Sequence, residues 1–185
     1  MRRIVLALAA ALTLAACGAN ERATRANPEL DELFAQLEAA PDTAVAAPIE
    51  QAIWVEWSDS GSPTVNVLLE RATAAETAGD AELAGRFLDQ ASDLAPEYAE
   101  PWNRRANLAY RAEDYRGAIA AIQETLKREP RHFGALAGLG LIYEELGQQR
   151  AALEAFRAAL AIHPHYETAI QGVRRLEPRV DGRDA

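Results

Sequence analysis

The sequence predicts an all-α fold of stacked helix hairpins, and three observations support this prediction. The chain is rich in alanine and only 6% aromatic, a composition that favours helices over sheets. Hydrophobic residues make up 49% of its 185 residues, too large a share for a disordered chain. Residues of similar size and polarity recur every 34 positions. A fixed period of this length is typical of repeat proteins whose helices share one continuous core.

Five columns of residues define the repeat and keep one register without a gap. In the first column Pro96, Pro130 and Pro164 lie 34 residues apart, and a proline there prevents the preceding helix from continuing. Small residues in two other columns allow the helix axes to approach closely. The four remaining columns are Leu68, Trp102 and Leu136; Ala72, Ala106 and Gly140; Ala84, Ala118 and Ala152; and Leu88, Ile122 and Phe156.

This pattern resembles the tetratricopeptide repeat (TPR) family, whose period is 34 residues. The copy at 133–166 matches all eight signature positions of that family, whereas the copies at 99–132 and 65–98 depart from several, for example with Arg105 in place of leucine. The resemblance implies a right-handed superhelical α-solenoid of about three helix hairpins: TPR 1 at 65–98, TPR 2 at 99–132 and TPR 3 at 133–166. The eight matching residues are Leu136, Leu139, Gly140, Tyr143, Ala152, Phe156, Ala159 and Pro164.

Within each hairpin a tight turn joins the two helices. Gly79-Asp80 and Gly147-Gln148 supply a glycine for this turn in the first and third copies. The second copy has Glu113-Asp114 instead, a poorer turn sequence, because glycine is the residue that adopts left-handed backbone angles without a steric penalty.

A divergent helix pair at 28–62 precedes the repeats. A first helix over 28–40 follows from apolar residues at helical spacing, with Asn27 as N-cap and Pro28 at the first helical position. A loop then leads to a second short helix over 48–57.

We expect this helix pair to cover the open end of the first repeat, with Trp54 and Trp57 closing that end. The alternatives are a partner surface built on the two tryptophans, a residue type enriched in binding hot spots, and self-association through the apolar pair. At the other end, residues 167–177 are predicted to form a capping helix and residues 178–185 a disordered tail.

Residues 1–16 have the pattern of a secretion signal. Arg2 and Arg3 precede an apolar run from Ile4 to Ala16, which is too short to span about 30 Å of hydrocarbon as a helix. Such a leader directs a bacterial protein through the Sec pathway.

The end of this leader, Leu14-Ala15-Ala16-Cys17, resembles the bacterial lipobox. The resemblance implies cleavage before Cys17, a diacylglycerol on its sulfur and acylation, for example with palmitate, of the new N-terminus. Two or three acyl chains anchor a protein stably. Gly18 replaces the aspartate that commonly retains such lipoproteins at the inner membrane, so the resemblance implies the periplasmic face of the outer membrane, with residues 17–27 as a flexible tether. Ordinary cleavage nearby, leaving a free thiol, is the alternative.

The sequence contains no recognisable catalytic set, so we expect no enzyme. No serine is paired with a histidine and a carboxylate in a known context. The three glycines within 134–140 fall inside a predicted helix, where close packing or a flat groove floor explains them better than a phosphate-binding turn.

Charge and histidine placement exclude other classes of partner. The net charge of −9 repels phosphate backbones, so we expect no nucleic acid. His132, His163 and His165 lie in predicted loops between repeats, where we expect them to be solvated, and no further metal ligands lie at suitable spacing. The prediction is therefore no metal, no cofactor and no small-molecule substrate.

The candidate site is the concave groove that the TPR resemblance implies. On the second repeat it is dense in amide and guanidinium donors, which suit a peptide backbone, a carboxylate or a loop; solvated helix faces are the alternative. The carboxylate clamp of chaperone-binding TPR proteins is absent, because Asn103 stands at its lysine position and Gly138 at one asparagine position. The candidate groove residues are Asn66, Leu69, Thr73, Asn103, Arg104, Asn107, Tyr110, Arg111, Leu141 and Glu144.

Together these patterns predict a membrane-anchored periplasmic scaffold or adaptor that binds a protein or peptide partner in its groove and acts in cell-envelope assembly. The alternative function is an accessory or regulatory subunit of a periplasmic hydrolase or protease.

Overall fold

The computed structural model describes residues 27–180 and 182, which form nine α-helices and no strand. The leader, Cys17 and the rest of the tether to residue 26 lie outside these residues. The helices are α1 (Pro28–Ala39), α2 (Thr43–Ser58), α3 (Pro63–Thr77), α4 (Ala81–Leu94), α5 (Glu100–Arg111), α6 (Tyr115–Arg128), α7 (Phe133–Glu145), α8 (Gln149–Ile162) and α9 (Glu167–Val180). Within the described ranges, none of these helices is long and apolar enough to cross a membrane.

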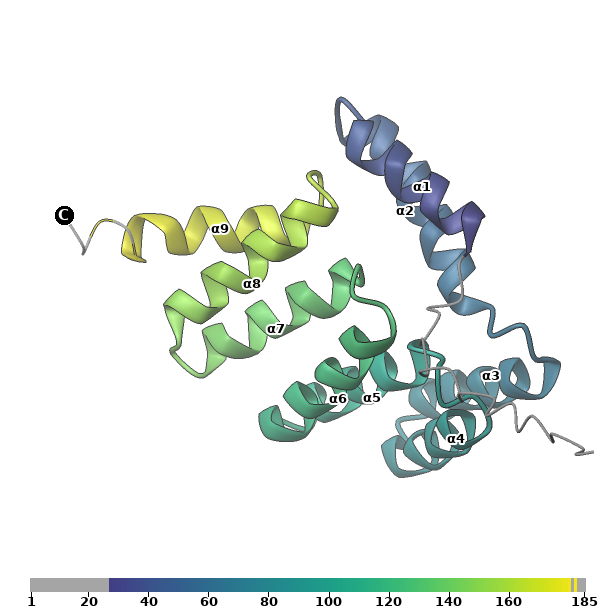
Figure 1. The fold of residues 1–185 in the computed structure, drawn as a ribbon. Coiled ribbons are helices and arrows are strands. Elements are labelled where there is room, and N and C mark those ends of the chain that lie inside the picture. Colours follow the sequence, from purple (N-terminus) through teal and green to yellow (C-terminus); the bar gives the residue numbers. More distant parts are fainter. Residues whose placement is uncertain (1–26, 181, 183–185) are drawn as a thin grey trace, which may run out of the picture.

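Helices α3 to α8 form three hairpins that stack in chain order, and α9 continues the stack (Figure 1). α3 packs on α4, α5 on α6 and α7 on α8, while the contacts of α4 with α5 and of α6 with α7 join consecutive hairpins. This is the all-α superhelix of stacked hairpins that the 34-residue period predicts.

The small-residue columns lie where helices cross. Ala72, Ala84, Ala118 and Ala152 are all fully buried. A Cβ atom on Gly140 of α7 would lie 2.6 Å from a ring carbon of Phe156, so the predicted close packing of this glycine is confirmed.

α9 caps the last hairpin as predicted, but it is longer than predicted. Leu176 and Val180 belong to the same buried cluster as Phe156 of α8, and a Cβ on Gly172 would lie 2.4 Å from the Phe156 ring. The helix continues through Pro178 to Val180, so the expected tail does not begin at residue 178. Val180 is buried in the cluster that α9 shares with α8. This burial explains why the helix tolerates a proline in its last turn.

The turns inside the hairpins use left-handed backbone angles at the predicted positions. Gly79 has φ 77° and Gly147 has φ 71°, while Glu113 takes φ 58° in the middle hairpin. A residue with a Cβ atom pays about 1 kcal/mol or more for this conformation, so the middle turn is strained relative to the other two.

α1 begins at its predicted cap, because the Asn27 side chain accepts hydrogen bonds from the backbone N–H groups of Glu29 and Leu30. α2 begins earlier than predicted: most of the expected loop before Pro48 is helical. The Asp42 side chain caps the helix by accepting from the backbone N–H of Val45 at 3.0 Å.

The early turn of α2 persists despite Pro48, which lies inside the helix. An interior proline removes one backbone hydrogen bond and costs about 3 kcal/mol. Ala46, one turn into the helix, is only 1% exposed and belongs to the core shared with α1. This burial, together with the cap, offsets the cost of the proline.

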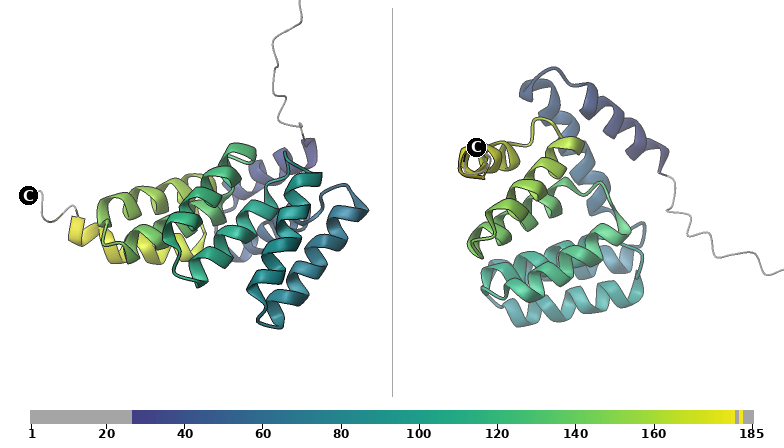
Figure 2. Two further views of the ribbon diagram at one scale, coloured as in Figure 1. Left: turned by 90° about the horizontal axis from the view of Figure 1, so that it is seen from below. Right: turned by 60° about the vertical axis from the view of Figure 1, so that its left-hand side comes forward.

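The α1–α2 pair does not cover the open end of the first repeat, and that prediction is wrong. The pair lies beside the stack (Figures 1 and 2) and packs on the segments that join α6 to α7 and α8 to α9. Leu37, Ile53 and Phe133 are fully buried in one cluster. Within the described residues this cluster contains none from α3 or α4. The physical reason is that Phe133 gives the pair an apolar surface at the loops.

The same repeat position contacts the pair three times, at Tyr98, His132 and Tyr166, which are 34 residues apart. The Tyr98 hydroxyl donates to the backbone carbonyl of Trp57 at 2.7 Å. The His132 ring stacks on the Trp57 indole, with centroids 4.1 Å apart and planes 9° apart. Tyr166 packs at the edge of the same cluster. The helix pair therefore contacts the C-terminal end of each of the three repeats.

The histidines are not solvated as predicted, because the helix pair covers them. His132 and His163 are fully buried. The Nε2 atom of His163 lies 3.1 Å from a Glu50 carboxylate oxygen of α2, and the Nε2 atom of His165 lies 2.8 Å from the Ala40 carbonyl. All three histidines of the chain thus hold the pair against the repeats. Among the residues that the structure describes, no three metal-binding side chains gather.

The strained middle turn generates the first prediction. Replacing Glu113 with glycine removes the steric cost of the left-handed angle, so we expect the free energy of unfolding in urea to rise by about 1 kcal/mol. The opposite change at the equivalent turn, Gly147→Glu, is the matched control and should lower it by a similar amount. Equal stability of the wild type and both variants would contradict the described turn geometry.

The docking of α2 generates the second prediction, because two glycines of α7 differ in what they face. A Cβ on Gly134 would lie 2.7 Å from the Trp54 ring of α2, whereas a Cβ on Gly138 meets nothing closer than Ile122 at 3.8 Å. Trp54 is packed among Trp57 and Phe133, so it cannot move away freely.

Thermal and urea unfolding should therefore separate the two alanine variants. Gly134→Ala is expected to lose about 1–3 kcal/mol by overpacking. Gly138→Ala is expected to gain about 0.5–1 kcal/mol from higher helix propensity. A gain in both variants would show that α2 is not docked on α7 in solution.

Candidate functional site

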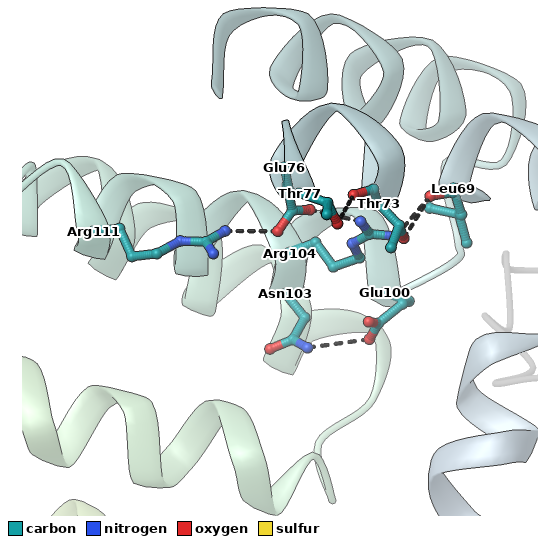
Figure 3. Close-up of polar contacts among 8 residues, drawn as sticks. All are labelled: Leu69, Thr73, Glu76, Thr77, Glu100, Asn103, Arg104 and Arg111. Carbon is teal, nitrogen blue, oxygen red and sulfur yellow. Dashed lines mark hydrogen bonds and ion pairs between the residues drawn. The ribbon is translucent and has the colours of Figure 1, made fainter. Parts of the chain in front are cut away.

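The predicted groove residues lie on one side of α3, α5 and α7, the first helices of the three hairpins; we call this side the groove face. An ion-pair network joins α3 to α5 at its centre (Figure 3). Arg104 Nη2 lies 2.6 Å from one carboxylate oxygen of Glu76, and Arg111 Nη2 lies 2.6 Å from the other. Arg104 Nη1 also donates to the Leu69 carbonyl at 2.9 Å.

The network keeps the Glu76 carboxylate ionised. Burial raises the pKa of this carboxyl, but hydrogen bonds and positive charge from Arg104 and Arg111 outweigh burial and hold the pKa below its ordinary value. The Arg104 and Glu76 side chains are only 16% and 19% exposed, whereas that of Arg111 is 57% exposed. Arg104 is therefore committed to α3, and only Arg111 presents a largely exposed guanidinium to a partner.

Several predicted groove residues are engaged within the chain. The Asn66 side chain donates to the Asp59 carboxylate at 2.8 Å and accepts from the backbone N–H of Ser60 at 3.0 Å. Asn103 is buried and donates to Glu100 at 3.1 Å. Leu69 is also buried, at 7% exposure. Asn66 therefore holds the α2–α3 turn against α3, whereas the Asn103–Glu100 contact lies within α5.

Other predicted residues are open to solvent. Asn107 is exposed and lies one turn before Arg111 on α5, so the two side chains are neighbours on the helix surface. Within the described residues Asn107 makes no side-chain hydrogen bond. Thr73 is exposed on α3, and its hydroxyl donates to the Leu69 carbonyl. Tyr110 is half-buried and packs against Tyr115, with ring centroids 6.0 Å apart.

On the third repeat, α9 contacts the groove residues, so they are less available to a partner. Glu144 receives two hydrogen bonds from Arg175 of α9, at 3.1 and 2.8 Å. Leu141 is half-buried and packs on the cluster that α8 and α9 share. The exposed donors among the predicted residues are thus concentrated on the second repeat.

A cavity of about 360 Å³ opens where the end of α2 meets α3 and α5. Sequence reasoning missed its α2 side, because the helix pair was expected elsewhere. The signal that could have found it is the short turn at 59–62, which keeps the end of α2 next to the start of α3. The lining residues are Val55, Ser58 and Asp59; Asn66, Leu69, Glu70 and Thr73 of α3; and Glu100 and Arg104 of α5.

Comparison with known proteins agrees with this architecture. A model of the tetratricopeptide repeat family matches residues 103–167. A TPR repeat-containing protein of Rhizobium etli is 40% identical over 153 residues, which cover 83% of this chain and 75% of that protein.

Solved structures share the fold at low sequence identity. The TPR domain of OM64 from Arabidopsis has a TM-score of 0.59 at 22% identity, covering 63% of this chain and 96% of that domain. The first TPR of Spaghetti (RPAP3), bound to an HSP90 peptide, has a TM-score of 0.60 at 17% identity, covering 65% of this chain and 95% of that one.

Stacked helix hairpins with an exposed polar groove face define a helical-repeat scaffold, a class that binds proteins and peptides. The chain belongs to the tetratricopeptide repeat family, as its similarity to the Rhizobium etli protein over most of both chains shows. Members of this fold class are typically non-catalytic.

The Glu76 network generates the third prediction. Glu76→Gln removes the charge while keeping the shape, so we expect a loss of about 1–2 kcal/mol in the free energy of unfolding at pH 7. Because the pKa of Glu76 is lower in the folded than in the unfolded state, its stabilising effect is present at neutral pH and is lost as the pH falls through the folded-state pKa.

Urea unfolding of the wild type and the variant should therefore differ at pH 7 and converge under acid. Glu70→Gln is the matched control, because Glu70 is exposed on the same helix; it should change stability by less than about 0.5 kcal/mol. A Glu76→Gln effect that stays constant down to acid pH would contradict the ion-pair assignment.

Proposed function

We propose that this chain is a lipid-anchored periplasmic TPR adaptor that binds a protein or peptide partner on its groove face and takes part in cell-envelope assembly. The observation that carries the proposal is the pair of exposed, neighbouring side chains Asn107 and Arg111 at the centre of the repeat stack. An amide and a guanidinium one turn apart can hold a backbone and an acceptor group of the same partner.

The proposed anchor is Cys17, which follows the lipobox-like sequence of the leader. Asn27, the first described residue, lies ten positions after Cys17. A chain of that length reaches at most about 35 Å when fully extended. The anchor would therefore keep the groove close to the membrane surface, where a membrane-bound partner would meet it often.

The proposal includes a non-catalytic role. A partner-binding scaffold needs no reactive group; most groove side chains make ion pairs, hydrogen bonds or packing contacts, and Asn107 and Arg111 are exposed to a partner. A regulatory subunit of a hydrolase or protease would use the same surface, and the nature of the captured partner distinguishes the two roles.

The fourth prediction tests the groove and the anchor together by crosslinking in intact cells followed by affinity capture. The double variant Asn107→Ala, Arg111→Ala should lose at least one envelope protein that the wild type captures. Cys17→Ser should move the chain out of the membrane fraction and reduce the same capture, since the anchor brings the two proteins together.

The matched control is Arg116→Ala with Gln123→Ala, an exposed guanidinium and an exposed amide on α6. It should capture the same partner as the wild type. Identical captures from the groove variant and the wild type would show that this face is not the working surface. A captured partner whose hydrolytic activity changes on adding the purified chain would identify the regulatory role.

A further inference from the structure

We propose that the cavity between α2, α3 and α5 receives a lysine or arginine side chain of the bound partner. This inference rests on the proposed function, because it names the chemistry of the peptide or protein segment that the groove face takes. It adds a cation site to the sequence-based expectation that the amide and guanidinium groups on α5 suit a peptide backbone, a carboxylate or a loop of the partner.

Each side chain around the cavity that can donate a hydrogen bond already makes at least one such bond within the chain. The Ser58 hydroxyl donates to the Trp54 carbonyl at 2.7 Å, and the Thr73 hydroxyl donates to the Leu69 carbonyl at 3.0 Å. The Asn66 amide donates to Asp59. Both terminal nitrogens of Arg104 donate, one to Leu69 and one to Glu76.

The lining also offers several hydrogen-bond acceptors to the cavity. Hydroxyl oxygens that have donated their hydrogen still accept, and the lining adds the carboxylates of Asp59, Glu70 and Glu100. A ligand group rich in N–H donors, such as an ammonium or a guanidinium, matches a lining of this kind.

The lining residues carry a net negative charge, which also favours a cationic ligand group. Its one guanidinium, Arg104, is paired with Glu76, which lies outside the lining. The three lining carboxylates therefore outnumber the one lining guanidinium, and that guanidinium is paired with a carboxylate outside the lining. Hydrogen bonds from Asn66 and from the backbone of Gly61 hold the pKa of Asp59 below its ordinary value, so this carboxyl is ionised at neutral pH.

Two neighbours of the cavity show how the carboxylates act on their surroundings. Burial, with the negative charges of Glu100 and Asp59, raises the pKa of the nearby Tyr98 hydroxyl. The fully buried His132 points its Nε2 atom towards Glu100 at 3.7 Å, without a hydrogen-bond partner at that nitrogen. Its Nδ1 accepts the backbone N–H of Ala135, so Nε2 carries the hydrogen of the neutral ring. The Glu100 oxygen nearest to His132 accepts a hydrogen bond from the Asn103 amide at 3.1 Å.

Size and apolar lining suit a long amphipathic side chain. A cavity of about 360 Å³ lies within the usual range of ligand pockets, about 300–1,000 Å³. Val55 of α2 is 58% exposed and, with Leu69, offers apolar surface for the methylene stem of lysine or arginine. The charged end can then lie among the carboxylates.

The fifth prediction uses three fluorescein-labelled ten-residue peptides in which alanine alternates with lysine, glutamine or glutamate. Fluorescence anisotropy with the full-length chain in detergent should show the lysine peptide binding most tightly and the glutamate peptide most weakly. Glu70→Gln should weaken lysine-peptide binding about fivefold, and Glu70→Gln with Glu100→Gln about twentyfold or more.

The matched control is Glu38→Gln with Glu154→Gln, which removes the same net charge from exposed sites on α1 and α8. It should leave the lysine-peptide affinity within twofold of the wild type. Equal weakening by the control would show attraction to the acidic protein as a whole and would overturn the proposal. Equal binding of the lysine and glutamine peptides would overturn it too.

The single Glu70→Gln variant tests the cavity even if the double variant fails to fold. Glu70 is exposed, and its replacement leaves the contacts of Glu100 intact. Failure here is distinguishable from failure of the adaptor proposal. If the cellular partner is still lost on Asn107→Ala, Arg111→Ala while Glu70 and Glu100 prove irrelevant to lysine peptides, the groove binds its partner without the cavity, and the inference about cations is wrong.

Discussion

The packing of α2 against the loop edges of the repeats is the contact on which the working surface of this solenoid depends. Stacked hairpins alone form an open, ribbon-like surface with a groove face on one side. Here Trp57 stacks on His132, and the cluster around Phe133 holds α2 at a fixed place beside the stack. That placement turns the end of α2 into a wall of the cavity and buries residues that would otherwise be solvated loops.

Charge pairing then determines which groove groups remain for a partner. The groove positions read from the sequence suggest free donors, with Arg104 and Arg111 ready for a peptide backbone, a carboxylate or a loop. The fold places Glu76 between them, so one guanidinium is fully engaged and the other is partly neutralised. The balance near α2 is acidic instead. The net charge of a groove face therefore depends on ion pairs between adjacent repeats, and it cannot be read from the residue types of one repeat alone.

The sequence predicts most of the fold, because the repeat is a local pattern. Capping and backbone rules that act within a few residues predict the start of α1 after its Asn27 cap. The same rules predict the turns at Gly79, Glu113 and Gly147. The place of the helix pair could not be predicted in the same way. It depends on a long-range contact with Phe133, a residue that the repeat pattern alone assigns to the start of an ordinary helix.

The site was predictable only in part for the same reason. Exposure of Asn107 and Arg111 follows from their position on the first helix of a repeat. The engagement of Asn66 by the α2–α3 turn and the burial of Asn103 depend on how neighbouring elements meet. The α9 extension to Val180 has a similar origin, since tertiary burial there overrides the local effect of a proline.

The way in which α2 spans all three repeats also has a mechanical consequence. A tension applied through the N-terminal end at Asn27 enters the molecule at α1. Side-chain packing joins the α1–α2 pair to the second repeat through His132 and to the third through Phe133. The load reaches the middle of the stack directly, without passing through α3 and the turns of the first repeat. The strength of the contact between the helix pair and the loops limits how much force the chain can transmit from its N-terminal end to the groove face.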